Sequence, residues 1–106
     1  MGSVLHLRDP RARYSARTLA PRGITVNCVS PGLTDTEAWR KMAAHMGQDA
    51  AQGASLCATI AKARCPMGKA IPPADIGACV AFLCSEGARF VTGNTLPVDG
   101  ALHLVG

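Results

Sequence analysis

Residues 24–30, ITVNCVS, form a short apolar and β-branched run that stops at Pro31 and Gly32. The run lacks the alternation of polar and apolar residues that is typical of a strand with one exposed face. It therefore predicts a strand that is buried on both faces, as in a parallel sheet covered by helices. Because ligands of open α/β sheets bind beyond the carboxyl ends of the strands, the Pro-Gly turn marks a candidate binding site.

Helical patterns lie on both sides of this strand. Residues 11–20 place Tyr14, Leu19 and the alanines on one apolar side and the arginines on the other, and Pro21 with Gly23 ends that helix. A second helical region is expected from Asp35 to Ala63.

The start and the interior of the second helical region carry specific signals. Thr34 and Glu37 are spaced as a capping box, in which each side chain satisfies a backbone N–H at the helix start. Gly47 and Gly53 are expected to break the region into two helices. A stripe of Trp39, Met42 and Met46 follows helical spacing and predicts packing against a core or a lid.

A third helix is predicted from Pro73 to Ser85, with Pro73 in its first turn, where the missing N–H costs nothing. A short strand is predicted from Asn94 to Val98, at the edge of the sheet because Pro97 cannot donate a ladder hydrogen bond. The order is helix, strand, helix pair, helix, strand. It predicts about one βαβ unit with a right-handed parallel crossover.

Composition narrows the class of protein. A chain of 106 residues with 48% hydrophobic and 17% charged residues is expected to form one globular domain. No apolar run is long enough for a membrane span, and no convincing signal peptide is present, so we expect a cytoplasmic protein without membrane association. Five of eight arginines precede residue 23, but with only 4% aromatic residues we do not expect nucleic-acid binding.

The five cysteines also argue against two kinds of site. Their number is odd and no two of them form a CxxC pair, so neither a zinc site nor any other metal site is predicted. We expect reduced cysteines that act as small hydrophobic residues, with a reactive thiol as the alternative.

Four segments resemble the short-chain dehydrogenase/reductase family. They are similar to the family patterns LAP-R/K-G-I-x-V-N-x-V-x-PG, P-x-G-R, PEDIAxxVxFLxS and FITGQTLxVDGG, in that order. The matching segments here are LAPRGITVNCVSPG at 19–32, PMGK at 66–69, PADIGACVAFLCS at 73–85 and FVTGNTLPVDG at 90–100. The resemblance implies a partial Rossmann-like α/β fold, namely the C-terminal βαβ part of a doubly wound parallel sheet. It assigns residues 13–106 to that domain and leaves residues 1–12 unmatched.

The resemblance also implies a cofactor, NAD or NADP, and places its nicotinamide end beside the Pro-Gly turn. The cofactor-binding residues carried over from the family are Pro31, Gly32, Thr36 and, through its backbone, Leu33. Proline and glycine leave little side-chain bulk at a strand end, and a helix start offers free N–H groups. The alternative is an ordinary strand-to-helix turn.

Two family elements are missing from the sequence. No G-x-G turn occurs, and Tyr14 is followed four residues later by Thr18 where the Tyr-x-x-x-Lys pattern has lysine. No catalytic residue is therefore assigned. His6, His45 and His103 are not grouped with a base or a nucleophile, and Asp35, Glu37 and Asp99 are expected to act as caps and turn residues.

Two functions remain open. The chain is expected to be a truncated part of an NAD(P)-dependent oxidoreductase that reduces a small apolar carbonyl or enoyl substrate by hydride transfer, and to be inactive alone. The alternative is a non-catalytic interaction module that forms a homo-oligomer through its last helix and strand. Backbone left open at a sheet edge would favour such pairing.

Overall fold

The computed structural model describes residues 2–6 and 10–105, with side chains described from residue 10 onward. The chain divides into two compact units. Met1–Ser30 and Ile76–Val98 form the first, which contains the sheet. Pro31–Asp75 and Asp99–Gly106 form the second, which contains a pair of helices and the loop that follows the central strand.

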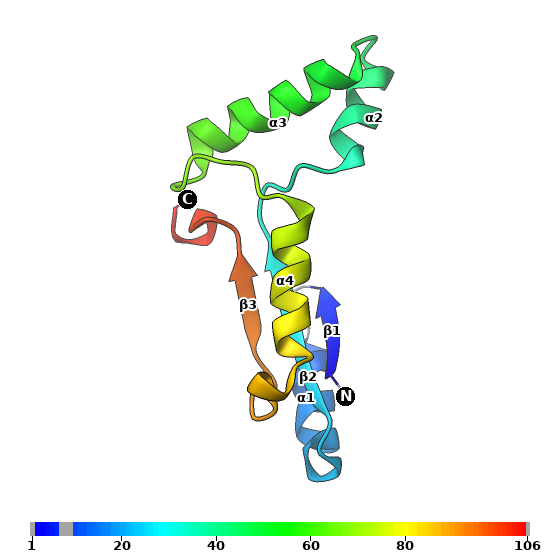
Figure 1. Ribbon diagram of the computed structural model, residues 1–106, viewed down its shortest axis with the longest axis vertical. Helices are drawn as coiled ribbons and strands as arrows, with labels where there is room; N and C mark the ends of the chain where they lie inside the picture. Colours follow the sequence, from blue (N-terminus) through cyan, green and yellow to red (C-terminus); the bar gives the residue numbers. More distant parts are fainter. Residues whose placement is uncertain (1, 7–9, 106) are drawn as a thin grey trace. The chain divides into compact units, whose positions relative to one another are not determined.

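The sheet has the strand order β1 (Gly2–His6), β2 (Thr25–Pro31) and β3 (Thr95–Val98). β1 pairs with β2 in parallel, and the three arrows in Figure 1 point the same way. This confirms the predicted parallel α/β fold. β1 was not predicted, because GSVLH is short and its pairing depends on the strand beside it. The division into residues 1–12 and 13–106 stays a prediction.

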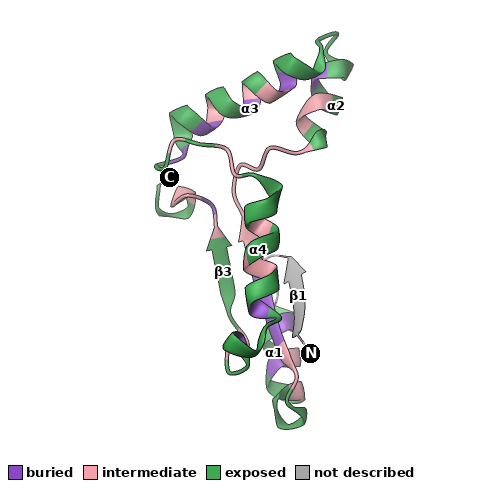
Figure 2. Ribbon diagram, viewed as in Figure 1, coloured by how far each residue is buried: buried purple, intermediate pink, exposed green. Residues whose placement is uncertain are grey.

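β2 is buried on both faces, as predicted. Four consecutive residues, 26–29, are each at most 3% exposed (Figure 2). On one face, α1 (Pro10–Leu19) packs Ala12 and Ala16 against Val26 and Cys28. The small alanines allow the helix to approach the strand closely. The prediction that Tyr14 lies on this apolar side is wrong, because Tyr14 is 74% exposed.

Asn27 is the one polar side chain in this buried run. Its amide donates a hydrogen bond to the carbonyl of Val91 at 2.8 Å and accepts one from the N–H of Asn94 at 3.2 Å. Next to it, the Cys28 N–H donates to the Asn94 carbonyl at 2.8 Å. Asn27 is thus satisfied by the segment that leads into β3, which offsets the cost of burying a polar group.

α4 (Pro73–Leu83) begins at Pro73, as predicted, and ends two residues before the predicted boundary. Its predicted apolar side turns inward, since Ile76, Cys79 and Val80 are half-buried and Leu83 is 4% exposed. Leu83 lines a cavity of about 290 Å³ together with Asn27 of β2 and Leu96 of β3. α4 therefore covers the face of the sheet opposite α1.

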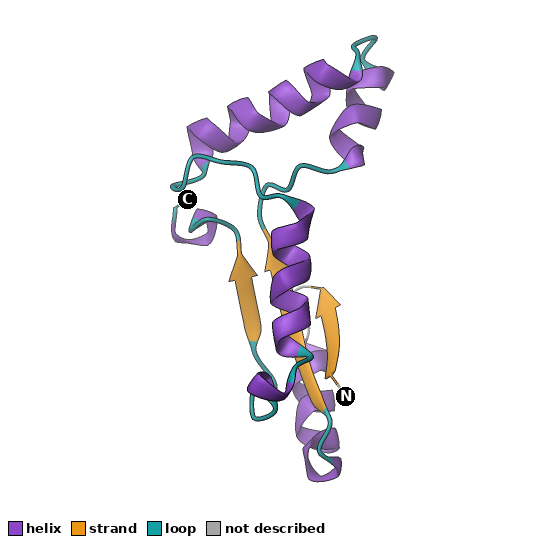
Figure 3. Cartoon of the chain, in the orientation of Figure 1, coloured by secondary structure: helices purple, strands orange, loops and turns teal. Residues whose placement is uncertain are grey.

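The second unit contains α2 (Glu37–His45) and α3 (Ala50–Arg64), joined by a short turn (Figure 3). Gly47 adopts a left-handed φ of 74° in this turn, so the predicted break there is confirmed. The predicted break at Gly53 is wrong, because Gly53 lies inside α3. Among the described residues, no helix is both long and apolar enough to cross a membrane.

The predicted capping box at Thr34 and Glu37 is also wrong. Thr36 is the N-cap of α2 and its side chain makes no capping hydrogen bond. The capping box lies instead at the start of α3, where Gln52 N–H donates to Asp49 Oδ1 at 2.8 Å and Asp49 N–H donates to Gln52 Oε1 at 2.7 Å. Both pairs have the same spacing, so only the backbone geometry separates them.

Gly53 is buried because α3 crosses α2 at this point. A Cβ atom on Gly53 would lie 2.5 Å from the carbonyl oxygen of Trp39 and 2.9 Å from its carbonyl carbon. These are backbone atoms that cannot rotate away. The absence of a side chain is therefore what allows the two helices to pack.

Gly53→Ala and Gly77→Ala form a matched pair that tests this contact. Gly53→Ala should lower the free energy of unfolding by about 1–3 kcal/mol, because the new methyl group pushes α3 from α2. Gly77 lies in α4 with open space around its missing Cβ. Gly77→Ala should raise the free energy of unfolding by about 0.5–1 kcal/mol through helix propensity. Urea denaturation followed by circular dichroism measures both, and equal effects would contradict the packing role.

Candidate functional site

The loop after β2 is held by a short stretch of backbone pairing. Thr34 and Ile71 form an isolated parallel bridge. Ile71 N–H donates to the Leu33 carbonyl at 2.8 Å, and Asp35 N–H donates to the Ile71 carbonyl at 3.0 Å. These bonds fix the backbone between the strand end and the start of α2. Predicted residues 31–33 and 36 therefore lie in one ordered segment of the second unit.

Gly32 is required at its position by a close approach of the chain. A Cβ atom there would lie 2.6 Å from the Cβ and 2.7 Å from the Cα of Asp99. Real Cβ atoms do not approach other atoms so closely, so any other residue would displace Asp99. The contact with Asp99 is a structural reason for glycine at position 32. It is separate from the predicted role of Gly32, which is to leave space for a flat cofactor ring.

Thr36 is half-buried at the N-terminus of α2, in an extended conformation with φ −120° and ψ 167°. Its carbonyl accepts a hydrogen bond from Trp39 N–H at 3.2 Å, while its hydroxyl caps no N–H of the helix. By contrast, the Thr34 hydroxyl donates to the Gly32 carbonyl at 3.0 Å. Of these two threonines, Thr36 has the hydroxyl that is left for another partner.

α2 and α3 hold the same loop from one side. The indole N–H of Trp39 donates to the Thr34 carbonyl at 3.0 Å, and the Cys57 thiol reaches the same oxygen at 3.9 Å. The predicted apolar stripe is thus divided, because Trp39 is half-buried whereas Met42 is 41% and Met46 62% exposed. The indole contact was not predicted, since hydropathy alone does not show where an N–H finds its acceptor.

Charges around the start of α2 are mainly acidic. Asp35 and Glu37 flank Thr36, and Arg40 lies 3.5 Å from the Asp35 carboxylate and 4.0 Å from that of Glu37. Burial raises the pKa of the Cys57 thiol above its ordinary value, and the nearby Asp35 carboxylate raises it further against the opposing effect of Arg40. The thiol therefore stays protonated at neutral pH.

Sequence patterns missed the support that the C-terminal turn gives to this loop. Asp99 is 8% exposed and its carboxylate bonds the ring of His103, at 2.9 Å from Oδ2 to Nδ1. The spacing of four residues between an acid and a histidine was the available signal. The sequence predicts Asp99 only as a turn residue and groups His103 with no other side chain, because only the fold shows that Asp99 lies against Gly32.

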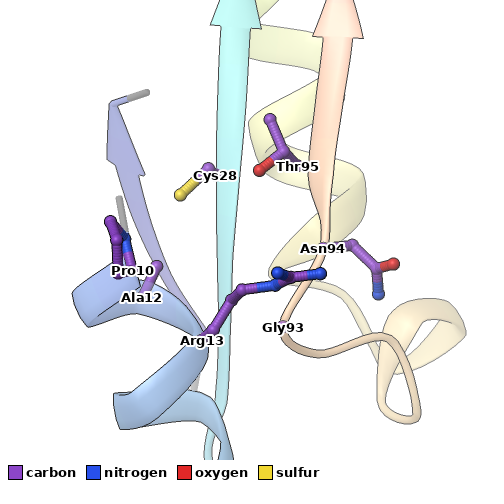
Figure 4. A pocket seen from close by; sticks show the side chains of 7 residues that line it. All are labelled: Pro10, Ala12, Arg13, Cys28, Gly93, Asn94 and Thr95. Atoms are coloured by element: carbon purple, nitrogen blue, oxygen red, sulfur yellow. The ribbon is translucent and has the colours of Figure 1, made fainter. Parts of the chain in front are cut away.

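Other chemistry in the described part of the chain is limited. No group of three His, Cys, Asp or Glu side chains there is arranged to hold a metal ion. None of the five cysteines, all of which lie in the described residues, forms a disulfide. A cavity of about 480 Å³ in the sheet unit is lined by residues of α1, β2 and the start of β3, and by none of the four predicted site residues (Figure 4). Its lining residues are Pro10, Ala12, Arg13, Cys28, Gly93, Asn94 and Thr95.

Comparison with known proteins identifies the family. A family model described as Enoyl-(Acyl carrier protein) reductase matches residues 9–103. The structure is similar to that of a short chain dehydrogenase family protein from Francisella tularensis subsp. tularensis SCHU S4, with a TM-score of 0.72 and 27% identity over 90% of this chain and 39% of that protein. The chain belongs to the short-chain dehydrogenase/reductase family.

Two further proteins are similar to this short-chain dehydrogenase/reductase chain in sequence. It is 36% identical to 3-oxoacyl-[acyl-carrier-protein] reductase FabG of Vibrio cholerae serotype O1, over 85% of this chain and 32% of the relative. It is 34% identical to angucycline C-6 ketoreductase LanV, solved with bound NADP, with a TM-score of 0.69 over 90% of this chain and 33% of that protein. The chain spans about a third of the length of the curated relatives it matches.

Tyr14 and the predicted cofactor-binding residues belong to different compact units. Tyr14 lies on α1 in the sheet unit and is 74% exposed. Thr18 follows it by one helical turn. The assignment of no catalytic residue and of Pro31, Gly32, Leu33 and Thr36 as the cofactor-binding set stays a prediction.

The raised pKa of Cys57 predicts a pH dependence of stability. As the pH rises above 9.0, the ordinary pKa, the thiol ionises in the unfolded chain before it ionises in the folded one. Unfolding is therefore favoured, and stability is lost until the pH passes the folded pKa. Urea denaturation at increasing pH above 9.0 should therefore show a fall in the free energy of unfolding that comes from this group.

Variants isolate the contribution of Cys57. Cys57→Ala should show a smaller fall in the free energy of unfolding over this pH range than the unmodified chain. Cys28→Ala, which replaces another buried cysteine, should retain the fall. If Cys57→Ala and the unmodified chain lose the same stability with pH, the raised thiol pKa is not the cause.

Proposed function

We propose that this chain contributes the nicotinamide-facing wall of an NAD(P)-dependent short-chain oxidoreductase, in which a carbonyl or enoyl group is reduced by hydride transfer. The observation that carries the proposal is the Thr36 hydroxyl, which caps no helix N–H although it stands at the start of α2. Membership of the family and the NADP bound to the relative LanV support a nicotinamide cofactor. The bound cofactor would supply the hydride.

The charges around Thr36 favour one part of the cofactor. Asp35 and Glu37 flank Thr36 and oppose Arg40, so the excess charge at this helix start is negative. A phosphate would be repelled there despite the positive end of the helix dipole. The neutral nicotinamide carboxamide, which both donates and accepts hydrogen bonds, suits the Thr36 hydroxyl and the free N–H groups of the first turn.

The four residues then have separate roles. Gly32 keeps the strand end free of side-chain bulk. Pro31 restricts the backbone immediately before Gly32, because its ring fixes φ. The Leu33 carbonyl bonds Ile71, so Leu33 contributes a fixed backbone position rather than a free acceptor. Thr36 hydrogen-bonds the carboxamide and thereby orients the ring, which is the contribution that positioning makes to hydride transfer.

Substrate selection is assigned to α2. Met42 on this helix and Met46 at its C-cap are large, exposed apolar side chains, and Trp39 on the same helix is half-buried. They support a small apolar carbonyl or enoyl substrate, and flexible methionines suit an irregular apolar surface. Proton transfer is not assigned to these 106 residues, because they contain no Tyr-x-x-x-Lys. We expect the chain alone to show no carbonyl or enoyl reduction.

Cofactor binding by the 106-residue chain tests the proposal. Saturation-transfer NMR should show contact between NADPH and the chain at millimolar concentration. Thr36→Val should weaken binding by about fivefold, because one hydrogen bond is lost. Thr59→Val, at an exposed position on α3, should leave binding unchanged. Equal binding by the two variants would remove Thr36 from the site.

A second candidate function is pairing of two copies through α4 and β3, in a homo-oligomer. The observation that favours it is the exposure of large apolar side chains on both elements, with Phe82 53% and Leu96 37% exposed. β3 is at one end of the described strand order, so one of its edges has no strand beside it there. Unlike the first function, this one needs no cofactor.

Sedimentation velocity tests the pairing. The chain should sediment as a dimer at micromolar concentration, and Phe82→Glu should convert it to a monomer because the new carboxylate would be buried in the contact. Tyr14→Glu is the matched control, since Tyr14 is a 74% exposed aromatic residue on α1. A monomeric unmodified chain would exclude the pairing in this form.

A further inference from the structure

Asp99 is the only buried charged side chain in the part of the chain that the structure describes. Its carboxylate is held by the C-terminal turn. Oδ1 accepts a hydrogen bond from Ala101 N–H at 3.1 Å, and Oδ2 accepts one from His103 N–H at 3.1 Å. The ring Nδ1 of His103 lies 3.0 Å from Oδ1 and 2.9 Å from Oδ2. His103 therefore bonds both oxygens from its ring and one from its backbone.

The other side of Asp99 lies against the loop of the proposed cofactor site. Its Cα and Cβ approach Gly32 so closely that no Cβ fits on Gly32. Both residues belong to the same compact unit. A change in the position of Asp99 is thus transmitted to Gly32 by direct steric contact, without an intervening side chain.

The carbonyl side of Asp99 has contacts of its own. The Cys65 thiol lies 3.4 Å from the carbonyl oxygens of both Asp99 and Gly100. Met67 N–H donates to the Gly100 carbonyl at 3.2 Å. These contacts hold the carbonyl side of Asp99, whereas its Cβ atom, the atom nearest to Gly32, is held through the carboxylate. The His103 ring, whose side chain is 43% exposed, is then the adjustable contact that sets the tilt of Asp99.

We propose that His103 is a positioning residue for the loop formed by residues 32–36. His103 fixes the Asp99 carboxylate, and Asp99 in turn fixes the backbone at Gly32. The position of Gly32 then determines the position of residues 33–36. The relevance of this loop to a nicotinamide rests on the proposed function. The positioning itself is a property of this chain and does not require a cofactor.

The expected signature is a change at Gly32 that a conservative variant rescues. In ¹H–¹⁵N spectra of the full chain, His103→Ala should move the Gly32 and Leu33 cross-peaks. It should also speed hydrogen exchange at Ala101 N–H by about fivefold, because the carboxylate is less firmly held. His103→Asn places an amide donor near the position of Nδ1 and should return the Gly32 cross-peak toward its original place.

His45→Ala is the matched control. His45 is an exposed histidine whose ring Nδ1 lies 2.9 Å from the Lys41 carbonyl of its own helix. Its removal should leave the Gly32 cross-peak unmoved. The reciprocal change, Gly32→Ala, should shift the imidazole proton resonances of His103. An unmoved Gly32 cross-peak in His103→Ala, or no rescue in His103→Asn, would overturn the proposal.

NADPH titration separates this proposal from the function on which it rests. If the unmodified chain binds NADPH, His103→Ala should weaken binding about three- to tenfold, and His103→Asn should restore it. Unchanged affinity in His103→Ala would overturn the positioning role. If the unmodified chain does not bind NADPH, the cofactor assignment fails, and the Gly32 cross-peak alone decides whether His103 positions the loop.

Discussion

The burial of β2 on both faces is the constraint on which the rest of the structure depends. Val26 and Cys28 accept the alanine side of α1, while Asn27 on the other face bonds the segment that leads into β3. A central strand of this kind needs apolar cover on each side and a neighbour along each edge. α1 and α4 supply the cover, and β1 and β3 supply the edges.

The same strand delivers its carboxyl end to the loop that carries the candidate site. Two close contacts between segments far apart in the sequence shape that region. Gly32 meets Asp99, and Gly53 meets the backbone of Trp39, each at a distance that excludes a Cβ atom. The loop is therefore held by steric fit and by backbone hydrogen bonds to Ile71. Such a fixed segment is suited to presenting one hydroxyl, that of Thr36, in a defined place.

The two proposed functions use different parts of the chain. A nicotinamide-facing role uses the loop at 32–36, where acidic neighbours favour a neutral carboxamide over a phosphate. Pairing of two copies uses the exposed apolar side chains of α4 and β3. The loop belongs to one compact unit, and Phe82 and Leu96 belong to the other. His103 connects to the first role alone, through Asp99.

The sequence by itself indicated the family through four segments that resemble its motifs. It also predicted the parallel α/β class and the approximate bounds of most elements, because hydrophobic periodicity, Pro73 and Gly47 act locally. It also marked Pro31–Gly32 as the end of the buried strand. The tertiary structure alone decided which of two capping-box patterns forms, why Gly53 lies inside a helix, and that GSVLH is a strand. It likewise revealed Asp99 and His103 as supports of the loop. Those features depend on contacts between distant segments, and local propensity carries no information about which segments meet.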